Sequence, residues 1–181
     1  MGNIDLVQLT EQTKKLTAMV VEDEKVTNEL LSSTFKNFFS DVTSCFNGEE
    51  ALSAYEANTP DVVFVDIVMS GMDGIELSRQ IRTLNPTQII IVISASNDIE
   101  KISESIEVGV NSFIQKPIDT KKIIELLTSV VSMITKKKKI ETKTFSISLP
   151  LDLYEVVNSN AKAESISKNA VIIRALRNFY E

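Results

Sequence analysis

Residues able to do chemistry stand at regular points along this sequence. Each lies at or just after the end of a short apolar run: Glu22, Asp23, Asp66, Ser94 and Lys116. Carboxylates gathered in one pocket repel one another and therefore need a cation. An oxygen ligand set without histidine or cysteine favours a hard ion such as Mg²⁺. A nearby lysine and a small hydroxyl would suit the oxygens of a phosphoryl group, which an aspartate can accept as an acyl phosphate.

A single acidic residue at such a point more often caps a helix or lies in a solvated loop. Agreement at successive strand ends argues against that simpler interpretation. The sequence contains no histidine, which excludes a Ser-His-Asp triad, a Cys-His pair and histidine-containing zinc sites. The single cysteine, Cys45, excludes an intramolecular disulfide and fits a reducing compartment.

Strand and helix patterns alternate through the first three quarters of the chain. Short apolar runs without a helical period predict five strands: residues 16–21, 42–46, 62–65, 89–93 and 110–114. Helical spacing follows each run, and Pro60, Pro86 and Gly109 end the helices after the second, third and fourth runs. Strands this continuously apolar are typical of a parallel sheet covered on both faces, hence an α/β fold. The carboxyl ends of its strands would form the ligand crevice and gather the candidate residues there.

Residues 16–135 resemble the receiver domain of two-component response regulators. The matching segments are Val-Val-Glu-Asp-Glu (20–24), Asn-Gly-Glu-Glu-Ala-Leu (47–52), Val-Asp-Ile-Val-Met-Ser-Gly-Met-Asp-Gly (65–74), Ser-Ala (94–95) and Lys-Pro (116–117). The resemblance implies a flavodoxin-like, doubly wound sheet of five parallel strands.

The same resemblance implies roles for individual residues. Asp66 would be the phosphoacceptor, receiving the phosphoryl group from a sensor histidine kinase. Asp23, Asp66 and the Val68 carbonyl would ligate Mg²⁺ directly, and Glu22 would do so through water. Lys116 and Ser94 would bind the phosphoryl group. Phe113 would be the aromatic switch residue, and the Lys116–Pro117 bond would be cis.

Charge divides the chain into an acidic body and a basic tail. Residues 1–135 hold 10 basic and 20 acidic side chains, a balance of −10, whereas residues 136–181 hold 9 and 5, a balance of +4. We expect four segments: an N-terminal extension (1–15), a receiver domain (16–135), a basic linker that could extend the last helix (136–142) and a tail domain (143–181). In the last helix of the body, Ile123, Leu127, Val130 and Ile134 form a short heptad-like seam, a possible dimer stalk.

The tail has its own pattern. Residues 144–149 alternate polar and apolar, as a half-buried strand does; a helix is predicted over 152–163, and Ser167 is placed to cap a second helix. One strand forms no sheet and about 40 residues bury little core, so this module requires a second copy.

The strand-helix-helix order resembles the ribbon-helix-helix (Arc/MetJ-type) DNA-binding family, whose dimers lay a two-stranded ribbon in the major groove. By that resemblance the outward strand residues Thr144, Ser146 and Ser148 would contact base edges, and Phe145, Ile147 and Leu149 would face the core. Ser167, Lys168 and Asn169 would hold a DNA phosphate. Lys143 and the run 136–139 would add salt-dependent attraction to the backbone.

Two functions remain open at this point. The first is a phosphorylation-dependent response regulator that binds DNA, at a palindromic operator, as a homodimer. The alternative is a receiver in a phosphorelay or scaffold, whose tail serves dimerisation or protein binding. A phosphatase with an aspartate nucleophile is disfavoured, because Val68 stands where a general acid would be needed and no histidine could replace it; we expect no enzyme. Apolar runs such as 89–93 are far shorter than the ~20 residues of a membrane span, so we expect a cytoplasmic protein.

Overall fold

The computed structural model describes residues 6–95, 99–141 and 149–164, together with positions 167, 168, 171, 172, 174, 175 and 178. The chain divides into two compact units, residues 1–141 and 142–181. Each unit is described by itself.

The first unit is built on a five-stranded parallel sheet. Its strands are β1 (Thr17–Val21), β2 (Asp41–Cys45), β3 (Val62–Val65), β4 (Ile89–Ser94) and β5 (Ser112–Gln115), in the order β2-β1-β3-β4-β5. All residues of β3 and β4 are buried. The predicted five-stranded parallel α/β sheet is confirmed.

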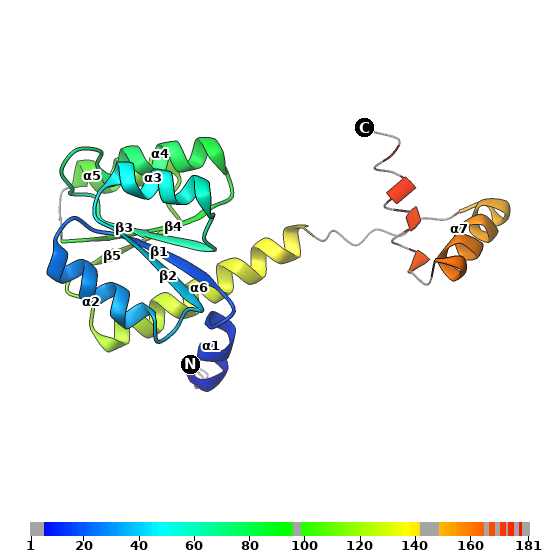
Figure 1. The fold of residues 1–181 in the computed structure, drawn as a ribbon, viewed down its shortest axis with the longest axis horizontal. Helices are drawn as coiled ribbons and strands as arrows, with labels where there is room; N and C mark the ends of the chain where they lie inside the picture. The colour runs from blue at the N-terminus through cyan, green and yellow to red at the C-terminus, as the bar shows by residue number, and fades with distance from the viewer. Residues whose placement is uncertain are drawn as a thin grey trace. The chain divides into compact units, whose positions relative to one another are not determined.

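Helices cover both faces of this sheet (Figure 1). Helices α2 (Lys25–Phe35) and α6 (Thr120–Glu141) lie on one face, and α3 (Gly48–Ala57), α4 (Gly74–Leu84) and α5 (Ile99–Val108) lie on the other. The sheet thus separates two apolar cores. In the first core the Phe35 ring stacks 4.4 Å from the Phe64 ring and 5.9 Å from Phe39, measured between centroids.

Several apolar residues with helical spacing face solvent instead of the core. Val26 and Leu30 of α2 are 70% and 64% exposed, and Ile99 and Ile106 of α5 are 81% and 65% exposed. The spacing predicted these helices correctly but not all of their buried positions. A polar side chain, Asn28, occupies part of the core face of α2, because its amide donates hydrogen bonds to two backbone carbonyls there.

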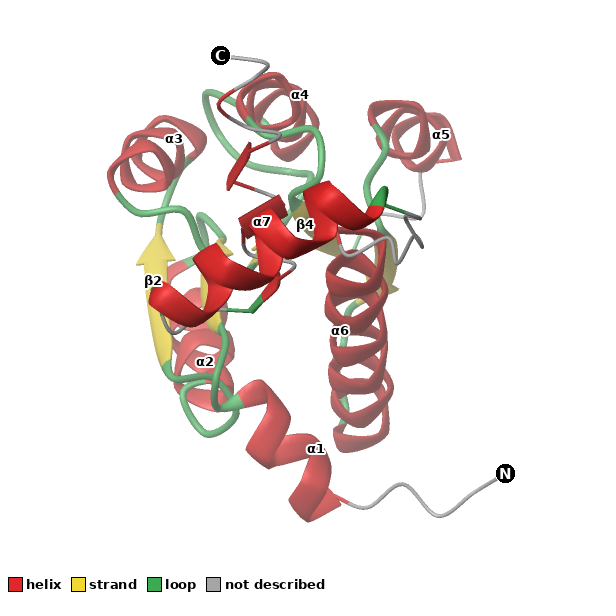
Figure 2. Ribbon diagram, turned by 90° about the vertical axis from the view of Figure 1, so that its right-hand side faces the viewer, coloured by secondary structure: helices red, strands yellow, loops and turns green. Residues whose placement is uncertain are grey.

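A short helix, α1 (Leu6–Thr13), precedes the sheet and packs against α6 (Figure 2). Leu9 and Thr13 are buried, and Leu9 belongs to the same apolar cluster as Leu127 and Val130 of α6. Ile134 packs against that cluster too. The seam expected to form a dimer stalk is therefore covered largely by the chain's own sheet and by α1.

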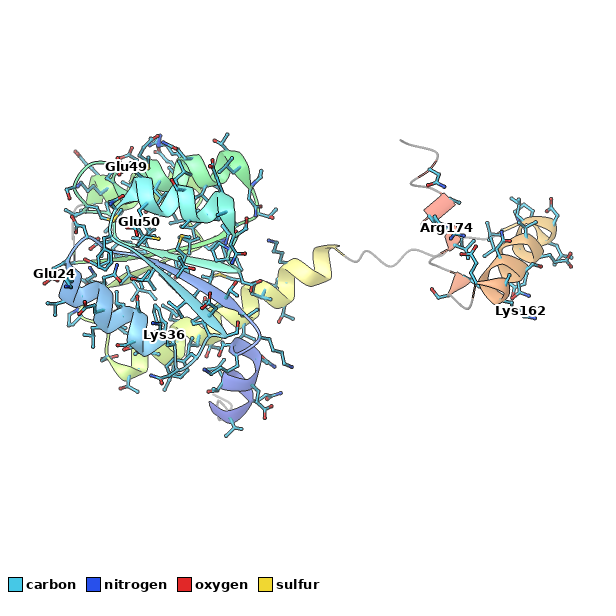
Figure 3. The ribbon with its side chains drawn as sticks, in the orientation of Figure 1. Glu24, Lys36, Glu49, Glu50, Lys162 and Arg174 are labelled. Carbon is cyan, nitrogen blue, oxygen red and sulfur yellow. The ribbon has the colours of Figure 1, made fainter. Side chains whose placement is uncertain are left out.

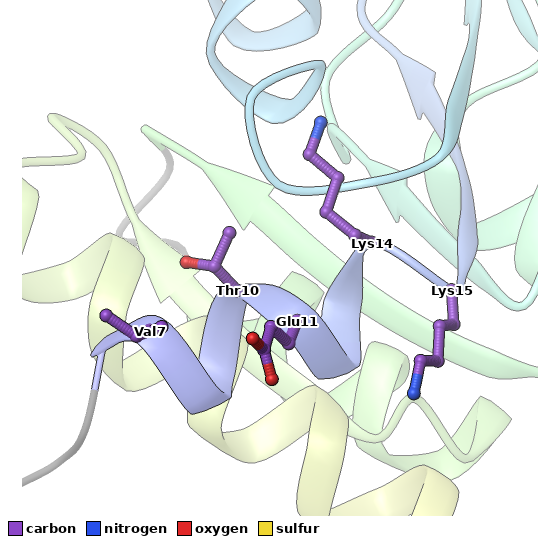
Figure 4. A pocket seen from close by; sticks show the side chains of 5 residues that line it. All are labelled: Val7, Thr10, Glu11, Lys14 and Lys15. Carbon is purple, nitrogen blue, oxygen red and sulfur yellow. The ribbon is translucent and has the colours of Figure 1, made fainter.

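Residues of α1 and the two lysines that follow it line an open pocket: Val7, Thr10, Glu11, Lys14 and Lys15 (Figure 4). One of them, Lys14, reaches across to the end of α2, where its ammonium donates to the Lys36 carbonyl at 2.9 Å. A cation at the C-terminus of a helix is favourable because the last carbonyls carry partial negative charge. This bond ties the end of α1 to α2, in addition to the packing of α1 against α6.

The second unit contains α7 (Leu151–Ala163), which begins directly after Pro150 as the sequence predicts. Ala161 and Val171 are buried. The Val171 amide donates to the Ser167 carbonyl at 3.2 Å, as in the first turn of a helix. The predicted strand lies outside the described residues, except for Leu149. Within the described part of the chain, no helix is long and apolar enough to span a membrane.

Candidate functional site

Three of the predicted site residues meet at the carboxyl edge of the sheet. Glu22 follows β1, Asp66 follows β3 and Lys116 follows β5. The Lys116 ammonium lies 2.5 Å from Asp66 Oδ2 and also contacts Glu22 Oε2. All three side chains are largely buried, with 18%, 8% and 4% exposure for Lys116, Asp66 and Glu22. Parallel strands bring residues that are 94 positions apart in the chain into one ion-paired cluster.

Burial and neighbouring charges shift the pKa values of Glu22 and Lys116. Removal from water raises the pKa of Glu22 above its usual range; the bond to Lys116 offsets this only in part, and the neighbouring Asp66 charge adds to the rise. Burial lowers the pKa of Lys116, but its bonds to Asp66 and Glu22 outweigh that effect and raise it overall. One ammonium thus balances two carboxylates, and the cluster keeps an excess negative charge.

The backbone around Asp66 is tightly fixed. Its amide donates to the Val21 carbonyl at 3.0 Å, and its Oδ1 accepts from the Val68 amide at 3.1 Å. Gly74 packs directly on the Asp66 carbonyl, where a Cβ would collide with the oxygen. Any larger residue at 74 would force the backbone carrying the Asp66 carboxylate to move.

Asp23 does not join this cluster. Its Oδ2 accepts two hydrogen bonds from Ser70, at 2.9 Å from the amide and 3.1 Å from the hydroxyl. The described residues contain no group of three or more Asp, Glu, Cys or His side chains arranged to hold a metal ion. The predicted ligand set is therefore brought together only in part: Glu22 and Asp66 are adjacent and Asp23 is turned to the loop.

The loop from Asp66 to Asp73 is held by further carboxylates. Glu49, at the start of α3, accepts from the Met72 amide at 3.2 Å, and Asp73 accepts from two amides of the first turn of α4. Gly71, just before Met72 in this loop, has φ +76°, a backbone conformation that residues with a side chain rarely adopt. Figure 3 shows Glu49 at the same end of the first unit as Glu24, which follows β1.

Ser94 and Phe113 lie where the sequence places them. Ser94 ends β4 and is fully buried, and its carbonyl accepts from the Lys116 amide at 3.0 Å. Phe113 is half-buried in β5, beside Val92 of β4, and packs against the core on the α3–α5 face. The Lys116–Pro117 bond is cis, as expected.

Asn28 is a positioning residue that the sequence analysis missed. It is fully buried, and its amide donates to the Glu22 carbonyl at 2.9 Å and the Cys45 carbonyl at 2.7 Å, joining the ends of β1 and β2. The only signal in the sequence is a polar residue at a position where helical spacing predicts the core. Ser70 and Glu49, which hold the loop, gave no comparable signal.

The donor chemistry of the site fits a hard divalent cation. Its side chains offer carboxylate oxygens alone, and the excess negative charge over Lys116 would be relieved by a cation. Asp23 lies one residue from Glu22 and could complete the set by turning away from Ser70.

The DNA contacts predicted for the tail are described only in part. Lys168 donates to the Tyr154 hydroxyl at 2.6 Å, and its ammonium lies 4.4 Å from the centroid of that ring. Ser167 is exposed, at the start of the helical turn described above. The remaining predicted contact residues lie outside the described residues: Lys143, Thr144, Ser146, Ser148 and Asn169.

The fold and this site define a receiver, and comparison with known proteins agrees. Residues 18–128 match the model of the response regulator receiver domain, and the chain belongs to that family. It is a receiver domain of phosphorylation-dependent signalling, the kind of domain that interacts with a histidine kinase or another phosphoryl donor.

Individual relatives cover the same region. A cyclic di-GMP phosphodiesterase of Thermotoga maritima is 34% identical over 104 residues, which are 58% of this chain and 28% of that protein. The N-terminal domain of an uncharacterized protein from Wolinella succinogenes is 32% identical with a TM-score of 0.63, covering 68% of this chain and 99% of that one. A Francisella response regulator receiver domain is 26% identical with a TM-score of 0.59, covering 66% and 99%. The chain thus spans little more than a quarter of the phosphodiesterase.

Proposed function

We propose that this chain is a response regulator that accepts a phosphoryl group at Asp66 and regulates transcription by binding DNA as a dimer through its tail. The observation that carries the first half is the buried Lys116–Asp66 ion pair at the carboxyl edge of the sheet. A lysine fixed at this point can stay paired with Asp66 after phosphorylation, because the phosphoryl group brings new anionic oxygens to which its ammonium can bind.

The proposed step is phosphoryl transfer from a histidine kinase. The P–N bond of the kinase's phosphohistidine breaks, its electron pair stays on the imidazole, and an Asp66 carboxylate oxygen forms the new P–O bond. Lys116 would neutralise charge on the transferred group, and Ser94 would hydrogen-bond one of its oxygens. The protein turns over no other substrate in this proposal, so it is not an enzyme.

Mg²⁺ is the cofactor we propose for this step. Asp23, Asp66 and the Val68 carbonyl would hold it directly, and Glu22 would do so through water. When bound it supplies positive charge against the phosphoryl oxygens. The chain's own contribution is to keep Asp66 fixed between Lys116 and the loop that follows it.

The switch that we propose uses Ser94 and Phe113. A phosphoryl group at Asp66 would draw the Ser94 hydroxyl toward it and leave space that the half-buried Phe113 ring could enter. Such a change would alter the surface near β4 and β5, and two surface states of this kind can be read by a partner or a second copy.

For the tail we propose a ribbon-helix-helix dimer. In its described part, α7 exposes large apolar side chains, with Leu151, Leu153 and Val156 at 74%, 50% and 56% exposure. A second copy would cover such a face, and the basic balance of residues 136–181 favours a polyanionic ligand. The same apolar face supports the alternative, in which the tail binds a protein in a phosphorelay or scaffold.

One experiment addresses both halves. The full chain and Asp66→Asn are incubated with acetyl phosphate and Mg²⁺, and intact-mass spectrometry measures phosphorylation. Both forms are then used to select DNA from a random pool. We expect phosphorylation of the wild type alone, and enrichment of palindromic sites with salt-sensitive affinity. No phosphorylation would overturn the receiver assignment of Asp66, whereas phosphorylation without DNA selection would favour the protein-binding alternative.

A further inference from the structure

Ser70 makes an unusual double contact with Asp23. Its amide and its hydroxyl both donate to the same carboxylate oxygen, Oδ2, at 2.9 and 3.1 Å. The two residues are 47 positions apart and belong to different loops at the carboxyl edge of the sheet. One side of the Asp23 carboxylate is therefore held by the loop that follows β3.

The loop has anchors that do not depend on the Ser70 hydroxyl. The Val68 amide donates to Asp66 Oδ1 at 3.1 Å and the Met72 amide donates to Glu49 Oε1 at 3.2 Å. Gly74 is packed against the Asp66 carbonyl. The backbone is fixed on both sides of residue 70. The hydroxyl bond therefore chiefly orients its partner, the Asp23 carboxylate, which can rotate.

The orientation of Asp23 decides whether three carboxylates can share one cation. In the described residues Glu22 and Asp66 are joined through Lys116, and no third acidic group completes a metal site. In the proposed Mg²⁺ arrangement the Asp23 carboxylate turns from Ser70 toward Glu22 and Asp66, which costs both of its bonds to Ser70; the hydroxyl bond is the one that a side-chain substitution can remove beforehand.

We propose that Ser70 is a positioning residue that competes with Mg²⁺ for Asp23 and so weakens the affinity of the receiver for the ion. This inference rests on the proposed Mg²⁺ site. The bond is lost when the ion binds, so it stabilises only the ion-free arrangement. A hydrogen bond to a charged group in an exposed setting corresponds to a factor of about three to ten in the equilibrium.

The test is a Mg²⁺ titration of the full chain, followed by isothermal calorimetry and by amide chemical shifts. We expect Ser70→Ala to lower the Kd for Mg²⁺ about three- to tenfold, and Ser70→Thr, which keeps the hydroxyl, to stay near the wild type. Ser33→Ala is the matched control, because it removes an exposed hydroxyl bonded only within α2. An unchanged or higher Kd for Ser70→Ala would overturn the inference.

Two further readouts separate this inference from the function it rests on. The thermal midpoint of Ser70→Ala without Mg²⁺ shows whether the variant keeps its fold. Phosphorylation by acetyl phosphate at saturating Mg²⁺ should match the wild type, whereas at low Mg²⁺ the variant should be phosphorylated faster. A wild type that binds no Mg²⁺ and accepts no phosphoryl group would contradict the proposed function. A wild type that does both, beside a Ser70→Ala variant with the same Kd, would contradict the role of Ser70 alone.

Discussion

The two units of this chain differ in how far they bury their large apolar side chains. The receiver buries its large apolar side chains on both faces of the sheet; Phe35, Phe64 and Ile91 are each no more than 1% exposed. In the tail, the described helix α7 leaves Leu153 and Val156 half exposed or more. Among the described tail residues only Ala161 and Val171 are buried hydrophobics, so the core that this part forms alone is small.

Charged residues show the same contrast. In the receiver Lys116, Asp66 and Glu22 are paired inside the protein, where burial raises the pKa of Glu22. In the tail the pairs Arg174–Glu164 and Lys168–Tyr154 lie at the surface, and Figure 3 shows Arg174 among the side chains of that unit. The described receiver contains a buried core and a buried ion-paired cluster, whereas the proposed tail dimer would cover the exposed apolar face of α7.

The largest effect is expected in the receiver core. Phe35→Ala removes a ring that contacts Phe64 and Phe39, and the cavity should lower the free energy of unfolding by about 3–5 kcal/mol. Urea denaturation followed by far-UV circular dichroism measures it. Val26→Ala on the same helix is the control and should change little, because Val26 is 70% exposed. Equal losses for the two variants would contradict the assignment of the core face of α2.

The exposure of Val26 also shows how far the sequence could predict the fold. The apolar runs and their stops predicted every strand of the receiver within a few residues. The reason is clearest for β3 and β4, which are buried throughout and apolar almost throughout. The helices were also predicted, but periodicity alone could not show that Val26 and Ile99 face solvent. Their burial depends on what packs against each helix, which is a property of the assembled sheet.

The candidate site shows a similar limit. Strand ends predicted that Glu22, Asp66 and Lys116 would meet, because parallel strands finish at one edge. The rotation of Asp23 toward Ser70 could not be predicted, since it depends on the path of a loop. The apolar seam of α6 could equally have been a dimer contact or part of the core, for the same reason. The helix α1 packs against α6, and nothing in the sequence of the seam indicates that contact.

The next effect concerns the ion-paired cluster. Lys116→Met leaves two buried carboxylates without a counter-ion and should cost about 3 kcal/mol of unfolding free energy at pH 7 without Mg²⁺. The loss should shrink toward pH 4 as Glu22 protonates, because burial raises the pKa of that carboxyl. Thermal unfolding at both pH values measures it, with exposed Lys121→Met as the control. A loss that stays the same at both pH values would contradict the electrostatic cause.

The third effect distinguishes the tail from the receiver directly. Leu153→Asp places a charge on the exposed apolar face of α7 and should weaken self-association of the full chain by about 2 kcal/mol, some 30-fold in Kd. The receiver transition should not move. Sedimentation velocity over a range of concentrations measures the association, and Ser159→Asp, elsewhere on α7, is the control. A wild type that stays monomeric at all concentrations would contradict the proposed tail dimer.

The smallest effect has the opposite sign and comes from Glu22. Burial raises the pKa of Glu22 in the folded protein, so between the unfolded and folded pKa values the folded state binds the proton more tightly. The unfolding free energy therefore falls as pH rises through that window, and at pH 7 the charged carboxylate costs stability. Glu22→Gln removes this cost and should slightly stabilise the Mg²⁺-free protein at pH 7. The gain should vanish below pH 4.5, where Glu22 is protonated in both states. Thermal melts with a chelator measure it, and exposed Glu56→Gln, which lacks the buried setting, is the control. A Glu22→Gln variant that is less stable than the wild type at pH 7 would mean that the bond from Lys116 to Glu22 stabilises the folded protein by more than the burial of the carboxylate costs.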